Sequence, residues 1–225
     1  MVITLSSEHN PMETNVIEVY AFATPNSVKV PIVLEELGLP YELKAVNVRK
    51  GEQKEDAFLS LNPNGKVPVL VDDGFVLTES AAILVHLAEK TGKLLPSDGE
   101  ARARVFEQLF FHASALIPAF GNAGFFMRSS PAPQPIAEAR FAKEAERILG
   151  ILDRKLAGQS FMADDAFTIA DIAHFGWLWR RQFPGLTLDE RPNLSRWYET
   201  VAARPAVQRA IARVEALAEA PTSVA

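Results

Sequence analysis

The chain of 225 residues contains no cysteine, no long apolar run and no excess of basic residues. The lack of cysteine excludes a disulfide framework, a cysteine-ligated metal and a cysteine nucleophile. Any thiol chemistry would therefore need a thiol that the ligand supplies. No apolar stretch approaches the length of a membrane span, and the N-terminus lacks the basic-then-apolar pattern of a signal peptide. We expect a cytoplasmic protein that does not enter a membrane.

The charge is also informative. The net charge is −5, and it falls in the first part of the chain: residues 1–95 carry 8 basic and 13 acidic side chains, and residues 96–225 carry 15 of each. Binding of nucleic acid needs a basic face, so this distribution argues against a nucleic-acid partner. An anionic ligand would have to be held by local donors rather than by the overall field.

The most patterned stretch covers residues 62–80. It opens with the turn sequence Asn-Pro-Asn-Gly, continues in the β-branched run 67–71, and turns back at Asp73-Gly74 toward a returning strand at 75–77. Thr78-Glu79-Ser80 then supplies side chains typical of a helix N-cap before an apolar helical segment. A hairpin followed by a capped helix is the simplest interpretation.

Pro68 stands close to the start of the predicted strand, although proline cannot donate to a β-ladder. A cis Val67–Pro68 bond would explain it and would turn the backbone of Val67 outward, where an extended peptide can pair with it. The helix start at Ser80 offers backbone N–H groups to a carboxylate.

This combination of a cis-proline, a hairpin and Glu-Ser at a helix start resembles the glutathione-binding half of cytosolic glutathione transferases. The resemblance implies a thioredoxin-like α/β N-terminal domain followed by an all-α C-terminal domain, the glutathione transferase fold. The first part of the sequence fits that order. We expect a parallel β-α-β unit made of a buried strand at 16–22, a helix ending at Gly38 and a strand at 41–46. A charged loop at 49–61 then connects this unit to the hairpin and to a helix at 79–90.

We expect three parts in the chain. Residues 1–15 form a polar, flexible tail in which Met12 is an alternative start, residues 16–92 form the thioredoxin-like glutathione-binding domain, and residues 100–220 form the all-α domain. Glycine, proline and polar residues between Thr91 and Gly99 mark the linker.

Nothing in the second domain suggests a strand. The predicted helices cover 101–117, the apolar steps from Phe141 to Leu156, and the closing segments 192–203 and 206–218; we expect Pro118 to Gly124 to interrupt the first helix and 129–135 to form a loop. Thr168 and Asp171 have the spacing of a capping box. The helix that they start is apolar on all sides, which predicts burial at the domain centre.

A bound thiol needs stabilisation as the anion. Lowering a thiol pKa by about two units takes roughly 2.7 kcal/mol, and one or two hydrogen bonds to the anion supply about 1.5–3 kcal/mol each. Thr24, with its hydroxyl, and Asn26, with its amide, lie where the first strand meets its helix, whose N-terminus adds positive potential. The alternative is that Asn26 only caps this helix.

Thr-Pro-Asn at this place is similar to the nu class of bacterial glutathione transferases, which are noted for glutathione disulfide reductase activity. The resemblance implies that Thr24 and Asn26 lie beside the glutathione sulfur and that Gln53 contacts its glycyl end. It also implies a homodimer in which Arg140 reaches the site of the partner subunit; the alternative for Arg140 is a solvated helix residue. The class usually has glycine after the asparagine, and this chain has Ser27.

The remaining predicted contacts follow from the same resemblance. Val67, before Pro68, pairs with the cysteinyl backbone of glutathione. Ser80 receives the γ-glutamyl carboxylate and Glu79 takes the ammonium, with helix capping as the alternative role of both. The extra charge in the loop from Gln53 to Asp56 leaves Lys54 as a further carboxylate partner. Glutathione is thus the expected co-substrate, and we expect no metal.

The acceptor side carries less information. Phe111, Phe125 and Phe126, in the aromatic stretch 110–127, are candidates for an apolar acceptor pocket, although aromatic residues at such spacing more often belong to a core. The histidines at 86, 112 and 174 lack metal-ligand spacing and are interpreted as structural, and Trp177 as a core residue.

The sequence thus predicts a glutathione transferase that activates the glutathione thiol for attack on a small electrophile or a disulfide. Disulfide reduction then needs two glutathione molecules, since the protein has no cysteine. A glutathione-dependent lyase that cleaves ethers and a non-catalytic ligand-binding or regulatory protein remain alternatives. The pattern does not identify the acceptor.

Overall fold

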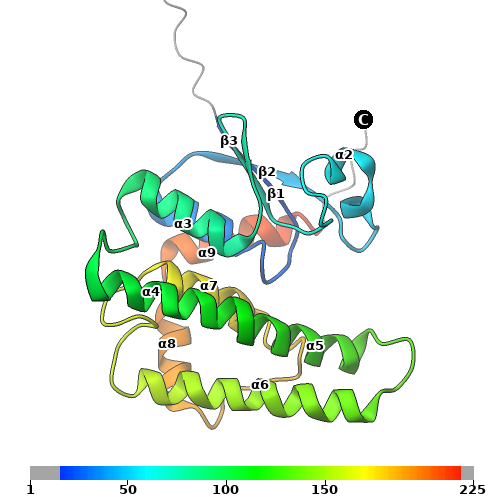
Figure 1. Ribbon diagram of the computed structural model, residues 1–225, viewed down its shortest axis with the longest axis vertical. Coiled ribbons are helices and arrows are strands. Elements are labelled where there is room, and N and C mark those ends of the chain that lie inside the picture. Colours follow the sequence, from blue (N-terminus) through cyan, green and yellow to red (C-terminus); the bar gives the residue numbers. More distant parts are fainter. Residues whose placement is uncertain (1–15, 219–225) are drawn as a thin grey trace, which may run out of the picture.

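The computed structural model describes residues 16–218, so the predicted tail at 1–15 and its Met12 lie outside the described residues. Figure 1 shows an α/β layer above a bundle of helices, and the last helix runs back beside the α/β layer. This arrangement agrees with the predicted α/β and all-α parts.

The sheet has four strands in the order β2-β1-β3-β4 within the described chain. β1 and β2 are parallel, with Ile17 opposite Tyr41, while β3 is antiparallel to both β1 and β4. Asp73 and Gly74 have φ values of 52° and 78°, the positive values that a tight hairpin turn between β3 and β4 requires. The strands are β1 (Ile17–Ala21), β2 (Tyr41–Ala45), β3 (Val69–Asp72) and β4 (Phe75–Leu77).

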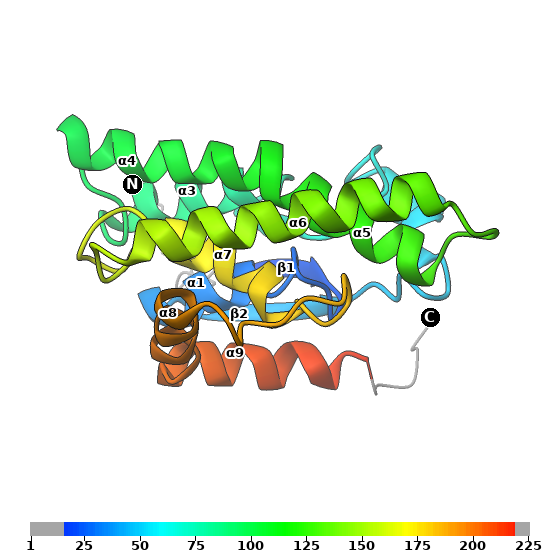
Figure 2. The same cartoon turned by 90° about the horizontal axis from the view of Figure 1, so that it is seen from below.

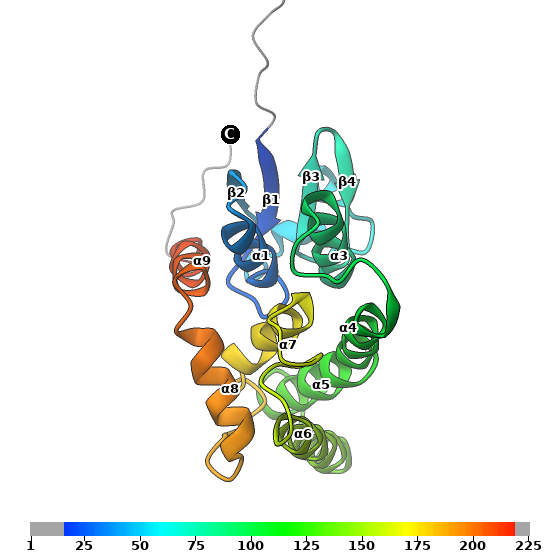
Figure 3. The same cartoon turned by 90° about the vertical axis from the view of Figure 1, so that its left-hand side faces the viewer.

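Two helices cover the face of the sheet that points to the helical part, α1 (Lys29–Leu37) and α3 (Ser80–Thr91) (Figure 3). Gly38 and Gly92 end them in the left-handed conformation, as glycine C-caps do. The charged loop after β2 contains a short 3-10 turn (Glu52–Lys54) and α2 (Asp56–Leu59).

The helical part continues from α4 (Gly99–Phe111) without the predicted interruption at Pro118–Gly124. A π-helical turn (His112–Leu116) joins α4 to α5 (Ile117–Arg128), and Pro118 is the second residue of α5, directly after this turn. The prediction of a break was therefore wrong. The later helices are α6 (Pro135–Leu156), α7 (Ile169–Trp179), α8 (Pro192–Ala202) and α9 (Pro205–Ala216).

The expectation that no segment approaches a membrane span was also too strong. By length and composition alone, the continuous helical segment Gly99–Arg128 is long and apolar enough to cross a membrane. In the structure, 39% of its most apolar window is buried. The core helix of a soluble protein passes the same test. Part of this apolar surface packs inside the protein and part, such as Phe110, lies exposed.

α7 lies at the centre of the helical part, as predicted, and Ile169 to Leu178 are all buried. The capping box is present: Asp171 accepts hydrogen bonds from the backbone N–H of Thr168 (2.9 Å) and Met162 (2.8 Å) and from the indole N–H of Trp197 (2.8 Å). One buried carboxylate thus ties α7 to α8 and to the preceding loop.

The closing helix α9 packs on α1 of the α/β part, opposite α4 (Figures 2 and 3). Arg204 forms two hydrogen bonds with Glu36 (2.6 and 2.8 Å), and Arg209 bonds to Glu35 (2.8 Å). The core is accordingly continuous through both parts, so α1 and α7 are held in a fixed mutual position.

We expect Asp171→Ala to destabilise the fold by about 3 kcal/mol or more, because three buried N–H donors would lose their acceptor. The midpoint of urea unfolding, followed by circular dichroism, measures this. Asp164→Ala, at an exposed position in the preceding loop, is the matched control and should change the midpoint little. Equal midpoints for the two variants would contradict the role assigned to Asp171.

Candidate thiol-binding site

The turn between β1 and α1 is organised by two hydroxyl groups. Thr24 Oγ1 donates to Ser27 Oγ (2.9 Å) and accepts from the backbone N–H of Ser27 (3.2 Å). Ser27 is fully buried, and its φ is not positive, so the turn does not require the glycine expected at this position. Either hydroxyl of this pair can donate, and with Ser27 as donor the proton of Thr24 is free for another acceptor.

Asn26 does not cap α1, as the alternative interpretation proposed. α1 begins after Val28 without a side-chain cap, and the amide oxygen of Asn26 accepts two hydrogen bonds, from Lys29 Nζ (2.8 Å) and from Trp177 Nε1 (3.0 Å). Because two donors hold the oxygen, the amide NH₂ on the other side of the group is the part left to face a ligand. The prediction of Asn26 as a donor is thus compatible with the geometry.

Neither of these two partners was predicted as a site residue. Lys29 is fully buried, and its Nζ also lies 3.2 Å from Ser80 Oγ and 2.8 Å from His112 Nε2. Burial lowers the pKa of Lys29 to about 7, an effect that the nearby charge of Glu79 partly opposes. The signal in the sequence was a lysine on the buried face of an otherwise apolar helix.

A cavity of about 470 Å³ opens beside this turn. Five of the predicted site residues line it, namely Thr24, Asn26, Gln53, Lys54 and Val67. Sequence reasoning missed the other lining residues, which are Val48, Leu59, Asn64, Gly65 and Lys66. The Oε1 atom of Gln53 is buried with no hydrogen-bond partner in the described chain. With two lysines at its rim, the cavity suits a ligand that carries carboxylates.

The Val67–Pro68 bond is cis, as predicted. Asn62 shapes the turn before it: its side-chain NH₂ donates to Lys66 O (2.7 Å), and its Oδ1 accepts from the N–H of Asn64 (3.0 Å). β3 begins only at Val69. Val67 therefore stands ahead of the ladder and lines the cavity, so its backbone is a candidate for pairing with an extended peptide.

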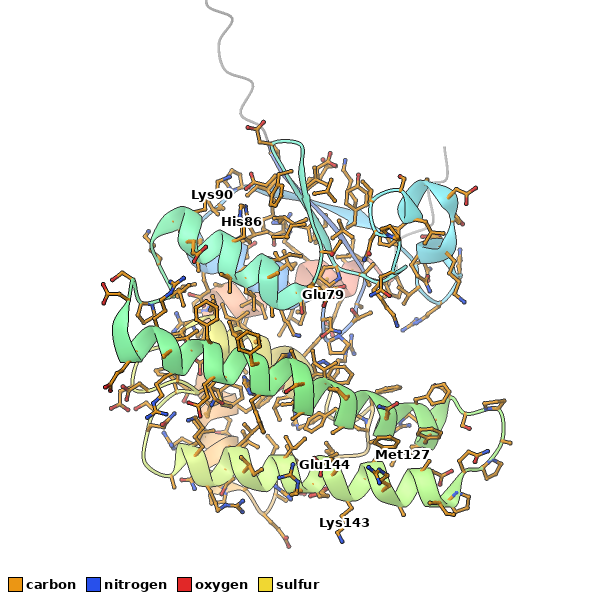
Figure 4. All side chains as sticks on the ribbon, viewed as in Figure 1. Glu79, His86, Lys90, Met127, Lys143 and Glu144 are labelled. Atoms are coloured by element: carbon orange, nitrogen blue, oxygen red, sulfur yellow. The ribbon has the colours of Figure 1, made fainter. Side chains whose placement is uncertain are left out.

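The start of α3 differs from the prediction. No side chain caps the helix, so the interpretation of Thr78-Glu79-Ser80 as a side-chain cap was wrong. Ser80 is buried, and its hydroxyl accepts from Lys29 instead. Glu79 lies at the start of α3 (Figure 4). Its φ of 64° and ψ of 110° form a backbone conformation that residues other than glycine rarely adopt and that often marks a ligand site. The first N–H groups of α3 remain available to an anion.

The structure does not bring the other predicted residues to this cavity. Arg140 is exposed on α6 of the same chain. Phe111 stacks on His174, Phe126 stacks on Phe141, and Phe125 is 44% exposed. Pro68, Glu79 and Ser80 also lie outside the lining of the cavity.

The histidines agree with a structural interpretation in their placement. His86 bonds to Asp72 (3.0 Å), and His112 and His174 are fully buried with ring centroids 5.0 Å apart. No cluster of potential metal ligands occurs within residues 16–218. Trp177 is buried as expected, but its hydrogen bond to Asn26 gives it a part in the site as well.

A larger cavity of about 670 Å³ lies elsewhere, between segment 181–189 and α8. Its lining contains both arginine and acidic side chains, among them Arg181 and Glu199, and none of the predicted site residues. Size alone therefore does not identify the functional site. The smaller cavity combines an oriented amide, a hydroxyl, a free backbone edge and two cations, an arrangement that can bind a peptide-like anion and place donors beside a thiolate.

Gly176 in α7 allows the close approach of the turn. A Cβ atom there would lie 2.3 Å from the carbonyl oxygen of Pro25 and 3.0 Å from Cγ of Lys29. Because the nearest atom belongs to the backbone, the turn would have to move. Gly176→Ala should therefore destabilise the protein by about 1–3 kcal/mol, as overpacking does, measured as a lower unfolding midpoint.

Gly150→Ala in α6 is the matched control, since its Cβ would meet only the flexible end of Arg154 at 3.4 Å. Its helical position favours alanine over glycine, so stability should stay equal or rise. A Gly176→Ala variant as stable as the Gly150→Ala variant would contradict the close packing between α7 and the turn.

Comparison with known proteins agrees with this geometry. Residues 23–90 match the family model of the glutathione S-transferase N-terminal domain, and residues 116–205 match that of the C-terminal domain. The disulfide-bond oxidoreductase YfcG of Escherichia coli (strain K12) is 35% identical over 208 residues, which cover 88% of this chain and 96% of the relative. YghU of the same organism, also named a disulfide-bond oxidoreductase, is 34% identical over 216 residues. The aligned region covers 88% of this chain and 75% of the relative.

Solved structures give the same result. A glutathione transferase family member from Pseudomonas fluorescens pf-5, with two glutathione bound, has a TM-score of 0.83 and 36% identity over 89% of this chain and 95% of its own. A glutathione transferase from Pseudomonas putida, with one glutathione disulfide bound per subunit, has a TM-score of 0.83 and 34% identity over 89% and 93%. The chain belongs to the glutathione S-transferase family.

Proposed function

We propose that the chain is a glutathione transferase of nu-class type that binds glutathione and reduces disulfides with it. The observation that carries the proposal is the amide of Asn26, whose oxygen is held by Lys29 and Trp177 so that its NH₂ group is left for a ligand. The disulfide-bond oxidoreductase names of two relatives and the glutathione bound in similar structures support it.

In this proposal glutathione lies in the 470 Å³ cavity with its cysteinyl backbone paired to Val67, beside Pro68. The γ-glutamyl carboxylate meets the uncapped start of α3 at Ser80, and Glu79 takes the ammonium. At the glycyl end, Gln53 and Lys54 line the cavity.

The sulfur lies beside Thr24 and Asn26, whose hydrogen bonds to the anion lower the thiol pKa. The thiolate attacks one sulfur of a disulfide, forms a mixed disulfide and releases the other sulfur as a thiolate, which takes up a proton. A second glutathione thiolate then attacks the mixed disulfide, so that glutathione disulfide and the second thiol leave. The same thiolate can attack a small electrophile, and a glutathione-dependent lyase remains a second candidate because it would use the same sulfur site.

Thr24→Val and Asn26→Leu remove one sulfur donor each and keep the side-chain volume similar. We expect each to raise the pKa of the bound glutathione thiol by about one unit and to lower disulfide reductase kcat/KM about tenfold or more. The ultraviolet absorbance of the thiolate, titrated with pH, measures the first effect, and steady-state kinetics measures the second.

Asn122→Leu is the control, since the side chain of Asn122 bonds to Pro118 O within α5, outside the cavity lining. A double variant of Thr24 and Asn26 with unchanged thiol pKa and turnover would refute the proposed mechanism. Glutathione that binds the unmodified protein only as the thiol would favour a non-catalytic binder.

We also propose a homodimer. Phe110 is 69% exposed on α4 and Phe75 is 51% exposed on β4, and these two elements lie on the same side of the molecule (Figure 3). We take these two exposed aromatic side chains as contacts for a second copy of the chain. In the dimer, Arg140 of one subunit reaches the glutathione site of the other. The aromatic residues Phe111, Phe125 and Phe126 remain candidates for the acceptor side.

Arg140→Ala should raise KM for glutathione about five- to tenfold, as loss of one exposed charge-assisted contact does, with little change in unfolding midpoint. Arg147→Ala, two turns further along α6, is the matched control and should leave KM unchanged. Equal KM values for the two variants, or a monomer in sedimentation equilibrium, would contradict the contribution from the partner subunit.

We further propose a division into the glutathione-binding domain at 16–92 and the all-α domain at 100–220. We propose a cytoplasmic location, where the glutathione pool is reducing. The acidic net charge supports the absence of a nucleic-acid partner. We propose no membrane association, since the apolar helical segment Gly99–Arg128 has a partly buried face and an exposed face that the dimer would cover.

A further inference from the structure

Lys29 is a fully buried lysine without a carboxylate in hydrogen-bond contact within the described residues. Its Nζ instead contacts the oxygen of Asn26 (2.8 Å), the hydroxyl of Ser80 (3.2 Å) and Nε2 of His112 (2.8 Å). A buried ammonium normally needs an anionic partner, because removal from water is costly. The glutathione S-transferase fold alone does not explain a lysine at this place.

The three contacts match the three N–H groups of an ammonium. The amide oxygen of Asn26 can only accept, and Ser80 and neutral His112 can accept as well. His112 is kept neutral, since burial and the charge of Lys29 lower its pKa well below the ordinary value. His174 donates through Nδ1 to Ala170 O (2.8 Å) and is also neutral, because burial lowers its pKa to about 4.

The charged groups around Lys29 come from each neighbouring element. His112 belongs to the π-helical turn, His174 to α7, and Glu79 precedes α3, where it is exposed. Glu79 is the carboxylate whose charge acts on Lys29, and it makes no hydrogen bond to Nζ in the described structure. When protonated, Lys29 therefore lacks a close anion unless a ligand supplies one. Burial lowers its pKa to about 7, so in the unliganded protein the amine is largely neutral at pH 8 and can take up a proton when an anion arrives.

We propose that Lys29 is the buried counter-charge of the glutathione thiolate and the positioning residue for the Asn26 amide. This inference rests on the proposed function. The amide of Asn26 lies between the two charges: its oxygen bonds to the ammonium, and its NH₂ faces the sulfur. The ammonium polarises the amide and makes its NH₂ a stronger donor to an anion. By holding Ser80, the same group also fixes the start of α3, where the γ-glutamyl carboxylate binds.

Packing around the lysine stem indicates that this position is built rather than accidental. Gly176 leaves room for Cγ and Cε of Lys29, which would lie 3.0 and 3.1 Å from a Cβ atom at that position. Trp177, the next residue in α7, donates to the same amide oxygen at 3.0 Å. α7 thus supplies the space for the lysine and the second hydrogen bond to Asn26.

The test compares Lys29→Met, which removes the charge and the donors, with Lys29→Gln, which removes the charge but keeps an NH₂ donor for Asn26. Each is saturated with glutathione, and the pKa of the bound thiol is measured by thiolate absorbance. We expect a rise of about one unit in both variants, which means about tenfold less thiolate at a fixed pH below that pKa. Lys143→Met, which removes an exposed lysine on α6, controls for the loss of one positive charge and should leave this pKa unchanged (Figure 4).

An unchanged thiol pKa in both Lys29→Met and Lys29→Gln would overturn the inference. A higher thiol pKa in Lys29→Met alone would mean that Lys29 only positions Asn26, and it would overturn the proposal that Lys29 is the counter-charge of the thiolate. A merely structural role would lower the unfolding midpoint without moving this pKa. If the unmodified protein does not lower the thiol pKa at all, the proposed function fails instead, so the two failures are distinguishable.

Proton exchange in the unmodified protein gives an independent measurement if these variants do not fold. Titration calorimetry at pH 8 in buffers of different ionisation enthalpy counts the protons released when glutathione binds. The thiol loses its proton, and Lys29, with a pKa of about 7 before binding, takes one up as its counter-anion arrives. We expect a net exchange near zero. Release of most of one proton would contradict the coupling of the two charges.

Discussion

The site depends on one constrained group, the side-chain oxygen of Asn26. Two donors from different parts of the chain reach it, Lys29 from α1 and Trp177 from α7. An asparagine amide has an accepting end and a donating end, so fixing the first determines the direction of the second. In the function that we propose, a chain without cysteine thus obtains an oriented donor for an anionic sulfur from a neutral side chain.

That constraint exists only because the two parts of the fold are packed together. α7 is the buried centre of the helical part and is tied down by Asp171, while α1 is held from the other side by α9 through Glu35 and Glu36. Gly176 lets α7 approach the turn at Pro25. Residues of the all-α part therefore determine the geometry of a site whose cavity is lined by the α/β part.

The sequence was sufficient for the elements whose residues act locally. The hairpin turn at Asp73-Gly74, the cis bond before Pro68 and the capping box of Thr168 and Asp171 depend on neighbours in the chain, and each was predicted. Pro118 was misinterpreted because the helical segment continues past it after a π-helical turn (His112–Leu116), which has no simple sequence signal. The cap expected before α3 was wrong because Ser80 bonds to Lys29, 51 residues away.

Within the site, the cavity contains Thr24, Asn26, Gln53, Lys54 and Val67, all of which the sequence indicated. The partners that orient Asn26 were missed. Trp177 reaches Asn26, and His112 reaches Lys29, only through long-range packing. Lys29 lies just three residues after Asn26, but its spacing alone did not show that its side chain turns back to the amide. Ser27 shows a different limit, because its partner Thr24 lies only three residues away. The sequence indicated a departure from glycine, but not that the serine hydroxyl would be the hydrogen-bond partner of Thr24.

The most direct measurement is a crystal structure of the protein with glutathione bound. The account predicts the sulfur within hydrogen-bond distance of Thr24 Oγ1 and Asn26 Nδ2, with Asn26 Oδ1 still held by Lys29 and Trp177. A sulfur placed away from both donors, or an Asn26 side chain that has left Lys29 and Trp177, would contradict it.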